Sequence, residues 1–283
     1  MSVTYDGLMS LKSMGDEFTY TDRDTMLYAL GVGMSRDPMN EDELRYTYEN
    51  DLKTVPTLAS VIAWGQRTIG QSGINYLLVV HGEQRLTMHQ PLPASATIIS
   101  DERVTGAVDK GPGKGALIFT EKNIRLKNGE KLCTVGGTIF ARGDGGFGGP
   151  STGALEPHPI PERKADAVCE TDTRVDQALL YRLSGDRNPL HSDPKIAKMA
   201  GFPRPILHGL CSYGTACRAV LKTICHYDHT MITGFDVRFS SPVFPGETLV
   251  TEMWKDGSIV SFRSKVKERD VVVINNGKCT LKH

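Results

Sequence analysis

Residues 181–194 read YRLSGDRNPLHSDP and residues 201–214 read GFPRPILHGLCSYG, and the second half of the chain is organised around these two stretches. Asp186, Asn188 and His191 fall within six residues, and Gly185 and Pro189 interrupt the stretch. A regular helix is incompatible with that pattern, so we expect a loop that turns several polar groups inward. A carboxylate and an imidazole held close together can bind and activate one water molecule. The alternative is purely structural: turn-forming polar residues beside a buried histidine whose hydrogen bonds are satisfied.

Two helices are expected to follow this loop. Asp193 is a suitable N-cap for a short helix over 194–200, because a proline then occupies the first helical position. Leu207–Tyr227 has apolar residues at helical spacing and contains no proline, so we expect a long helix there. His208 and Gly209 open this helix. The free backbone N–H of Gly209 would point outward at the positive end of the helix dipole, where it suits a developing oxyanion.

The segments after the long helix have the character of strands. We expect strands over Met231–Phe239, Thr248–Trp254, Ile259–Val266 and Val271–Ile274. Asp256-Gly257 is a hairpin signal between two of them, and Asn275-Asn276-Gly277 is expected to form a turn after the last. The first half repeats the order, with a shorter helix over Thr57–Gly65 and strands over Thr97–Val104, Gly115–Lys122 and Cys133–Phe140. A helix followed by an antiparallel meander predicts the α+β class for each half.

Two local matches indicate that the chain is a duplication. Leu27–Gly33 resembles Leu180–Asp186, and Pro93 corresponds to Pro245, at offsets of 153 and 152 positions. Each short match is weak by itself, so the argument rests on the agreement of the two offsets. Glycine and proline are dense in the middle of the chain and break regular structure. We therefore expect an N-terminal domain over 1–142, a linker over 143–163 and a C-terminal domain over 164–283.

The composition narrows the class of protein. With 33 basic and 33 acidic side chains, the chain has no formal net charge, which argues against binding to nucleic acid or to a membrane surface. No apolar run approaches the ~20 residues of a membrane span, and residues 1–15 contain no signal-peptide core. We expect a bacterial cytoplasmic protein, or a peroxisomal one if the chain is a domain of a longer enzyme. The six cysteines form no C-x-x-C pair, so we expect reduced core thiols and no metal site.

The second-half stretch resembles a known family signature. The string from Tyr181 to Pro194, followed by Gly201 to Cys211, is similar to the hydratase 2 motif of the (R)-specific enoyl-CoA hydratases of the MaoC-like family. This motif also occurs in the hydratase part of peroxisomal multifunctional enzyme type 2. Further matches are Leu27–Gly33, His81–Gln84, Asp109–Ala116, Arg238–Phe239 and Pro242–Leu249. The resemblance therefore covers nearly the whole chain, with the long second-half motif as its most specific part.

The resemblance implies a double hot-dog fold, in which two antiparallel sheets each wrap around a helix. It implies reversible hydration of a trans-2-enoyl-CoA to the (R)-3-hydroxyacyl-CoA, with Asp186 and His191 sharing one water as the acid/base pair. Asn188 is expected to orient the water, and the Gly209 N–H to stabilise the enolate oxygen of the thioester. At the repeat offset Gly33 replaces Asp186, so the first half is expected to hold the acyl chain rather than to react.

By the same resemblance, the residues that line the substrate are His81, Gly82, Lys110, Arg187, Pro189, Leu190 and Phe239. Coenzyme A is part of the substrate, and no metal or separate cofactor is implied. The family also implies a homodimer. Three other functions stay open: a hot-dog acyl-CoA thioesterase, a dehydratase acting on carrier-protein or polyketide intermediates, and a non-catalytic acyl-CoA binding module. The Asp-x-Asn-Pro-x-His string favours the hydratase over the thioesterase, and the intact Asp186 and His191 argue against the binding module.

Overall fold

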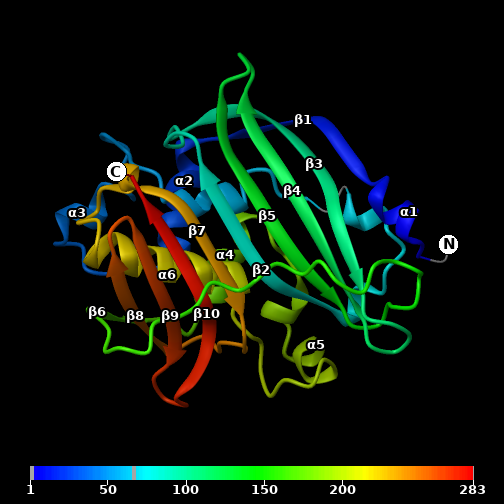
Figure 1. The fold of residues 1–283 in the computed structure, drawn as a ribbon. Helices are drawn as coiled ribbons and strands as arrows, with labels where there is room; N and C mark the ends of the chain where they lie inside the picture. Colours follow the sequence, from blue (N-terminus) through cyan, green and yellow to red (C-terminus); the bar gives the residue numbers. More distant parts are fainter. Residues whose placement is uncertain (1–2, 66–67, 283) are drawn as a thin grey trace.

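The computed structural model describes residues 3–65 and 68–282, which form an antiparallel sheet of ten strands (Figure 1). The strands are β1 (Lys12–Tyr20), β2 (Val79–Met88), β3 (Ala96–Asp109), β4 (Ala116–Leu126), β5 (Lys131–Ala141), β6 (Ala167–Asp172), β7 (Ile232–Phe239), β8 (Thr248–Asp256), β9 (Ile259–Val266) and β10 (Val271–Leu281). The α-helices are α1 (Tyr5–Met9), α2 (Asp22–Gly31), α3 (Glu41–Leu44), α4 (Gln177–Tyr181), α5 (Pro194–Met199) and α6 (Gly209–Thr223). Short 3₁₀ turns cover Pro56–Ser60, Ile69–Gln71, Tyr76–Leu78, Arg182–Ser184, Pro189–His191 and His229–Met231.

The two halves of the sheet repeat one strand order. From its outer edge inward the first half runs β1-β3-β4-β5-β2, and the second half runs β6-β8-β9-β10-β7. The inner strands β2 and β7 pair with each other, with Gln84 opposite Val237. Beside this pair the Asp236 carboxylate accepts a hydrogen bond from the Leu86 N–H at 3.2 Å, where the ladder is interrupted. The repeated order agrees with a duplication, but the two sheets implied by the resemblance are joined into one continuous sheet.

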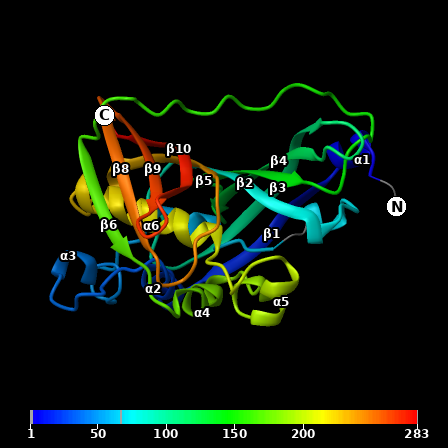
Figure 2. The same cartoon turned by 90° about the horizontal axis from the view of Figure 1, so that it is seen from below.

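Helix α6 lies in the interior, against the second half of the sheet (Figures 1 and 2). It is buried around almost its whole circumference, from Leu210 to Leu221, which is typical of a helix enclosed by other elements. Its closest neighbours include β6 and the turn Pro56–Ser60. The predicted long helix is confirmed, but it ends earlier than Tyr227. His226 and Tyr227 have φ values of 47° and 59°, so the chain leaves the helical conformation there.

Among the described residues of the first half, no helix corresponds to this long one. The predicted helix over Thr57–Gly65 is wrong, because only the 3₁₀ turn Pro56–Ser60 forms there. Its buried residues Leu58 and Ala59 belong to the same core as α6. The β-branched pair Val61-Ile62 follows directly, and β-branched side chains favour helix less than straight-chain ones. The helix of the second half therefore supplies packing for both halves.

All seven predicted strands are present, and the differences in their bounds are informative. β9 has the predicted bounds, and β8 continues to Asp256. β10 continues to Leu281, so the predicted turn at Asn275-Asn276-Gly277 is wrong. Asn276 has φ 53°, and the pairing of β10 with both neighbours shifts register around it, so these residues form a bulge inside the strand. Strands β1, β2 and β6 were not predicted, because apolar and polar residues do not alternate regularly along their whole length.

The segment between β5 and β6 crosses the face of the sheet opposite α6 (Figure 2). Near its start the Asp109 carboxylate accepts hydrogen bonds from the N–H groups of Gly111, Gly146 and Gly148, at 2.9, 2.7 and 2.9 Å. Further along, His158 Nε2 lies 2.8 Å from the Ser261 hydroxyl on β9. This glycine-rich segment contains the predicted linker, and we retain the division at 142 and 164 as a proposal.

Two expectations about the whole chain can be compared with the structure. All six cysteines are buried and unbridged, which confirms the prediction of reduced core thiols. Within the described ranges, no helix is both long enough and apolar enough to cross a membrane.

Candidate active site

The loop between α4 and α5 brings the predicted acid/base residues together. Two 3₁₀ turns shape it, and Gly185 between them has φ 138°, a conformation that residues with a Cβ rarely adopt. A Cβ at Gly185 would also lie 2.8 Å from Cγ of Trp64, in the first half. The Asp186 carboxylate accepts the Asn188 N–H at 3.0 Å, and the Asn188 side chain accepts the Leu190 N–H at 3.0 Å. The loop conformation is therefore set by its own polar residues.

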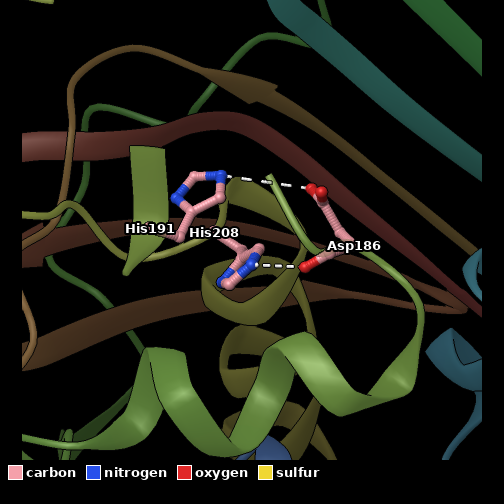
Figure 3. A group of neighbouring side chains, drawn as sticks. All are labelled: Asp186, His191 and His208. Carbon is pink, nitrogen blue, oxygen red and sulfur yellow. Dashed lines mark hydrogen bonds and ion pairs between the residues drawn. The ribbon is translucent and has the colours of Figure 1, made fainter. Parts of the chain in front are cut away.

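Asp186 and His191 face each other across this loop (Figure 3). His191 Nε2 lies 4.0 Å from Asp186 Oδ2, which is too long for a direct hydrogen bond. His191 Nδ1 lies 2.9 Å from the Ile206 carbonyl oxygen, so Nδ1 carries the proton and donates it there. Nε2 then presents its lone pair toward Asp186. A water oxygen about 2.8 Å from each atom can donate one hydrogen to the carboxylate and the other to the imidazole.

The electrostatic environment keeps His191 neutral. Burial lowers its pKa below the ordinary value, and the positive charge of Arg182 acts in the same direction. The bond to Ile206 and the charge of Asp186 oppose this shift without reversing it. The site therefore contains a carboxylate and an unprotonated imidazole nitrogen, which are two proton acceptors.

His208 is a site residue that the sequence reasoning missed. Its ring stacks on His191 with a centroid separation of 3.8 Å, and its Nε2 lies 3.1 Å from the Asp186 carbonyl oxygen (Figure 3). The residue is 1% exposed. The sequence identifies His208 only as the residue before Gly209. The signal was its place in the motif, but a contact across more than fifteen residues is not visible in spacing alone.

Gly209, which the sequence predicts to donate to an oxyanion, lies at the N-terminus of α6. Gly209 is the first residue of this helix, and a first-turn N–H has no partner within its own helix. The Phe239 ring lies next to this helix end, because a Cβ at Gly209 would be 3.4 Å from it, in ordinary van der Waals contact. Phe239 in turn lies against His81 of the first half, at 4.9 Å between ring centroids. Both halves of the sheet thus contribute to the site.

The pKa of His81 is affected by burial and by the charge of Asp186. Burial lowers the pKa of His81 to about 4, while the charge of Asp186 acts to raise it. Its Nε2 lies 3.1 Å from the Glu83 carbonyl oxygen. Gly82 beside it lies at the irregularity of β2, where a Cβ would come within 3.2 Å of the Thr138 carbonyl oxygen. His81 is therefore a neutral ring close to the carboxylate.

The other predicted substrate-binding residues are more exposed. Arg187 and Pro189 are exposed and Leu190 is partly exposed on the catalytic loop. Lys110 follows the end of β3, is exposed, and has its ammonium group 4.8 Å from the centre of the Phe140 ring. No measured contact joins Lys110 to the catalytic loop within the described residues.

Asp186, His191 and His208 also offer three ligand atoms that lie within 4.8 Å of one another. A carboxylate and two neutral imidazoles are groups that bind divalent transition metals. His208 Nε2, however, donates its hydrogen to the Asp186 carbonyl, and a ligating nitrogen must be free of hydrogen. A metal bound through this nitrogen would have to break that bond, whereas a water shared by Asp186 and His191 leaves it intact.

Comparisons with known proteins cover both halves. The model described as MFE-2 hydratase 2 N-terminal domain matches residues 18–143, and the MaoC like domain matches residues 157–277. A protein of Arabidopsis thaliana named "Enoyl-CoA hydratase 2, peroxisomal" is 42% identical, over 95% of this chain and 93% of its own length. The mouse "Peroxisomal multifunctional enzyme type 2" is 38% identical over 91% of this chain, which spans 36% of the mouse protein.

Solved structures agree with these matches. A MaoC-like dehydratase from Phytophthora capsici superposes with a TM-score of 0.87 at 34% identity, covering 99% of this chain and 98% of its own. A Mycobacterium tuberculosis protein described as having a double hotdog fold gives a TM-score of 0.60 at 17% identity, covering 99% of this chain and 98% of its own. The second match concerns the fold alone, and it confirms the double hot-dog prediction.

Proposed function

The chain belongs to the MaoC-like hydratase 2 family, and from that premise we propose that it adds water reversibly to a trans-2-enoyl-CoA to give the (R)-3-hydroxyacyl-CoA. The observation that carries the proposal is the 4.0 Å separation of Asp186 Oδ2 and His191 Nε2 beside the N-terminus of α6. This arrangement supplies two acceptors for one water and one donor for an oxyanion. Relatives named enoyl-CoA hydratase 2 support the reaction type.

The reaction uses both acceptors to hold the water and one of them to carry its proton. Asp186 and His191 hold the water, and its oxygen attacks C3 of the substrate as one of the two residues takes a proton. The electron pair of the C2–C3 double bond moves toward the thioester, so negative charge develops on its oxygen. The protonated residue then gives the proton to C2 on the same face, which restores the site. One water is consumed, and no net proton is released.

The Gly209 N–H stabilises the developing charge on the thioester oxygen. Its position at the first turn of α6 adds the helix dipole to the hydrogen bond. The loss of one such donor typically costs about 10²–10³ in rate. Because the thioester itself acidifies C2, the reaction needs no redox cofactor, and we propose none. Asn188 is proposed to orient the water, and its side chain also fixes the loop by accepting the Leu190 N–H.

The substrate is proposed to enter between the two halves. Phe239 and His81 lie next to the end of α6, so they can contact the thioester and the first carbons of the chain. The first half, which lacks an acid/base loop, is proposed to hold the remaining acyl chain. Lys110 and Arg187 are exposed cations suited to the phosphates of coenzyme A. The predicted homodimer and the location, bacterial cytoplasm or peroxisome, also stay proposals.

The experiment that tests this proposal is a direct assay with crotonyl-CoA and trans-2-decenoyl-CoA. Loss of the conjugated enoyl absorbance, followed by chiral analysis, is expected to give the (R)-3-hydroxyacyl-CoA. Asp186→Asn is the control, because it keeps the size of the side chain and removes its charge. Release of free coenzyme A without hydration would indicate a thioesterase instead. Turnover only of carrier-protein thioesters would indicate the dehydratase alternative.

A further inference from the structure

His208 contacts each of the three groups to which the proposed reaction assigns a role. Its ring nitrogen Nε2 lies 3.1 Å from the carbonyl oxygen of Asp186. Its ring stacks on that of His191, at 3.8 Å between centroids and 30° between planes. Its backbone is the N-cap of α6, so the N–H of Gly209 belongs to the peptide that His208 begins. The residue itself reaches the water only through these neighbours.

The hydrogen-bonding state of the ring follows from its partners. The carbonyl of Asp186 is an acceptor, so His208 Nε2 carries the hydrogen and donates it. Nδ1 is then an acceptor, and it is buried without a hydrogen-bond partner among the described residues. Burial, together with neighbouring His191 and Arg182, lowers the pKa of His208 to about 3, so the ring is neutral. The single donated bond to Asp186 therefore fixes its polar end.

A buried histidine with an unpaired ring nitrogen destabilises the fold more than an apolar side chain at the same position would. An unsatisfied buried acceptor costs about 1–3 kcal/mol, which an apolar ring or chain would avoid. The site is otherwise suited to an apolar residue, because His208 is 1% exposed and its other ring neighbour is Tyr181, at 5.1 Å between centroids. The feature that an apolar residue lacks is the N–H that holds the backbone of Asp186. This points to a role in the site rather than in packing.

We infer that His208 is a positioning residue, which holds the Asp186 backbone, the His191 ring and the Gly209 N–H in one fixed arrangement. This inference rests on the proposed hydration and deepens it. The His191 ring is held at one end by the Ile206 carbonyl and along its face by His208. The Asp186 carbonyl is held by the same imidazole. A displacement of about 1 Å in such a site can cost about 10²-fold in rate, so the contribution is measurable.

Two substitutions separate the bond from the bulk of the ring. His208→Gln can place a side-chain N–H near the position of Nε2, whereas His208→Asn places one near Nδ1 and cannot reach the Asp186 carbonyl. His208→Ala removes both the bond and the stacking. The control is His229→Ala. Like His208, His229 has an unpaired Nδ1 among the described residues, but it is only partly buried and lies beside Tyr46, away from the catalytic loop.

The test measures kcat and KM for trans-2-decenoyl-CoA, with thermal unfolding as a check on folding. We expect His208→Ala and His208→Asn to lower kcat by about 10- to 100-fold with KM changed by less than about threefold, in line with a displaced site. His208→Gln is expected to recover most of kcat, and His229→Ala to keep it. Equal kcat values for the Gln and Asn variants, or a change confined to KM, would overturn the inference even if His208→Ala failed to fold.

The pH profile gives a second readout, because the ring of His208 covers that of His191. His191 faces the charges of Asp186 and Arg182 and the ring of His208. Removing that ring exposes His191, so its pKa rises toward the ordinary value and activity is lost at a higher pH on the acidic side. An unchanged acidic limb in His208→Ala would contradict this. If the wild-type protein hydrates no enoyl-CoA, the proposed function itself is rejected. If the wild-type protein hydrates the substrate and the His208 variants have the same kcat, only the positioning role is rejected.

Discussion

Removal of the Glu43 carboxylate should destabilise both halves of the molecule together. Glu43, on α3 of the first half, is 1% exposed and pairs with Arg218 on α6, whose side chain is 13% exposed. Two hydrogen bonds of 2.9 and 3.0 Å join the guanidinium to the carboxylate. The carboxylate also accepts the Tyr227 hydroxyl at 3.0 Å and the Ser35 N–H at 2.8 Å. Glu43→Ala leaves all of these donors unpaired, including one buried positive charge.

The expected loss in free energy of unfolding is about 3–5 kcal/mol, the usual cost of removing one partner from a buried pair. Urea unfolding followed by intrinsic fluorescence measures it, because Trp64 and Trp254 report from different halves. The matched variant is Glu43→Ala with Arg218→Ala, which removes both charges. It should be more stable than the sum of the single losses predicts, by about 0.5–3 kcal/mol. A loss under about 1 kcal/mol for Glu43→Ala, or strictly additive losses, would refute this reasoning.

Three further outcomes are expected. Gly185→Ala should lower kcat by about 10²-fold, because the φ of 138° and the contact of the new Cβ with Trp64 force the catalytic loop to move. Steady-state kinetics measure this effect, and a kcat near the wild-type value would contradict it. The acidic limb of the kcat profile should lie below pH 6.5, because His191 works unprotonated and its pKa is lowered; a limb above that value would show the opposite sign. Asp109→Ala should expose residues 143–149 to proteases, since three backbone N–H groups lose their acceptor, and an unchanged digestion time course would count against this.

The parts of the fold that sequence reasoning predicted are those bounded by strong local signals. Helix α6 lies between a proline-rich approach and a polar turn, and β9 lies between Asp256-Gly257 and a charged turn. Asn275-Asn276-Gly277 carried an equally strong turn signal, yet the strand continues through it. The same residues satisfy a turn and a bulge, because both require a positive φ, and only the pairing with β7 and β9 decides between them.

Sequence reasoning predicted the site contacts within one loop but missed those between distant segments. Asp186 and His191 lie on one short loop, so their proximity follows from sequence. His208 reaches them through three-dimensional packing, and His81 reaches Phe239 only because β2 and β7 become neighbours at the centre of the sheet. Contacts of that kind depend on how two halves meet. No local pattern in either half encodes them.

The shared strand order of the two halves has a consequence for how such a protein can change. A pair of identical subunits must accept every substitution twice, once on each side of its axis. Here each half has its own sequence within one chain. Gly33 can therefore occupy the position that corresponds to Asp186 while the Asp186 carboxylate is retained. One side is free to lose its reactive loop and its long helix while the other keeps both. Covalent linkage thus permits an asymmetry that a symmetric assembly cannot inherit.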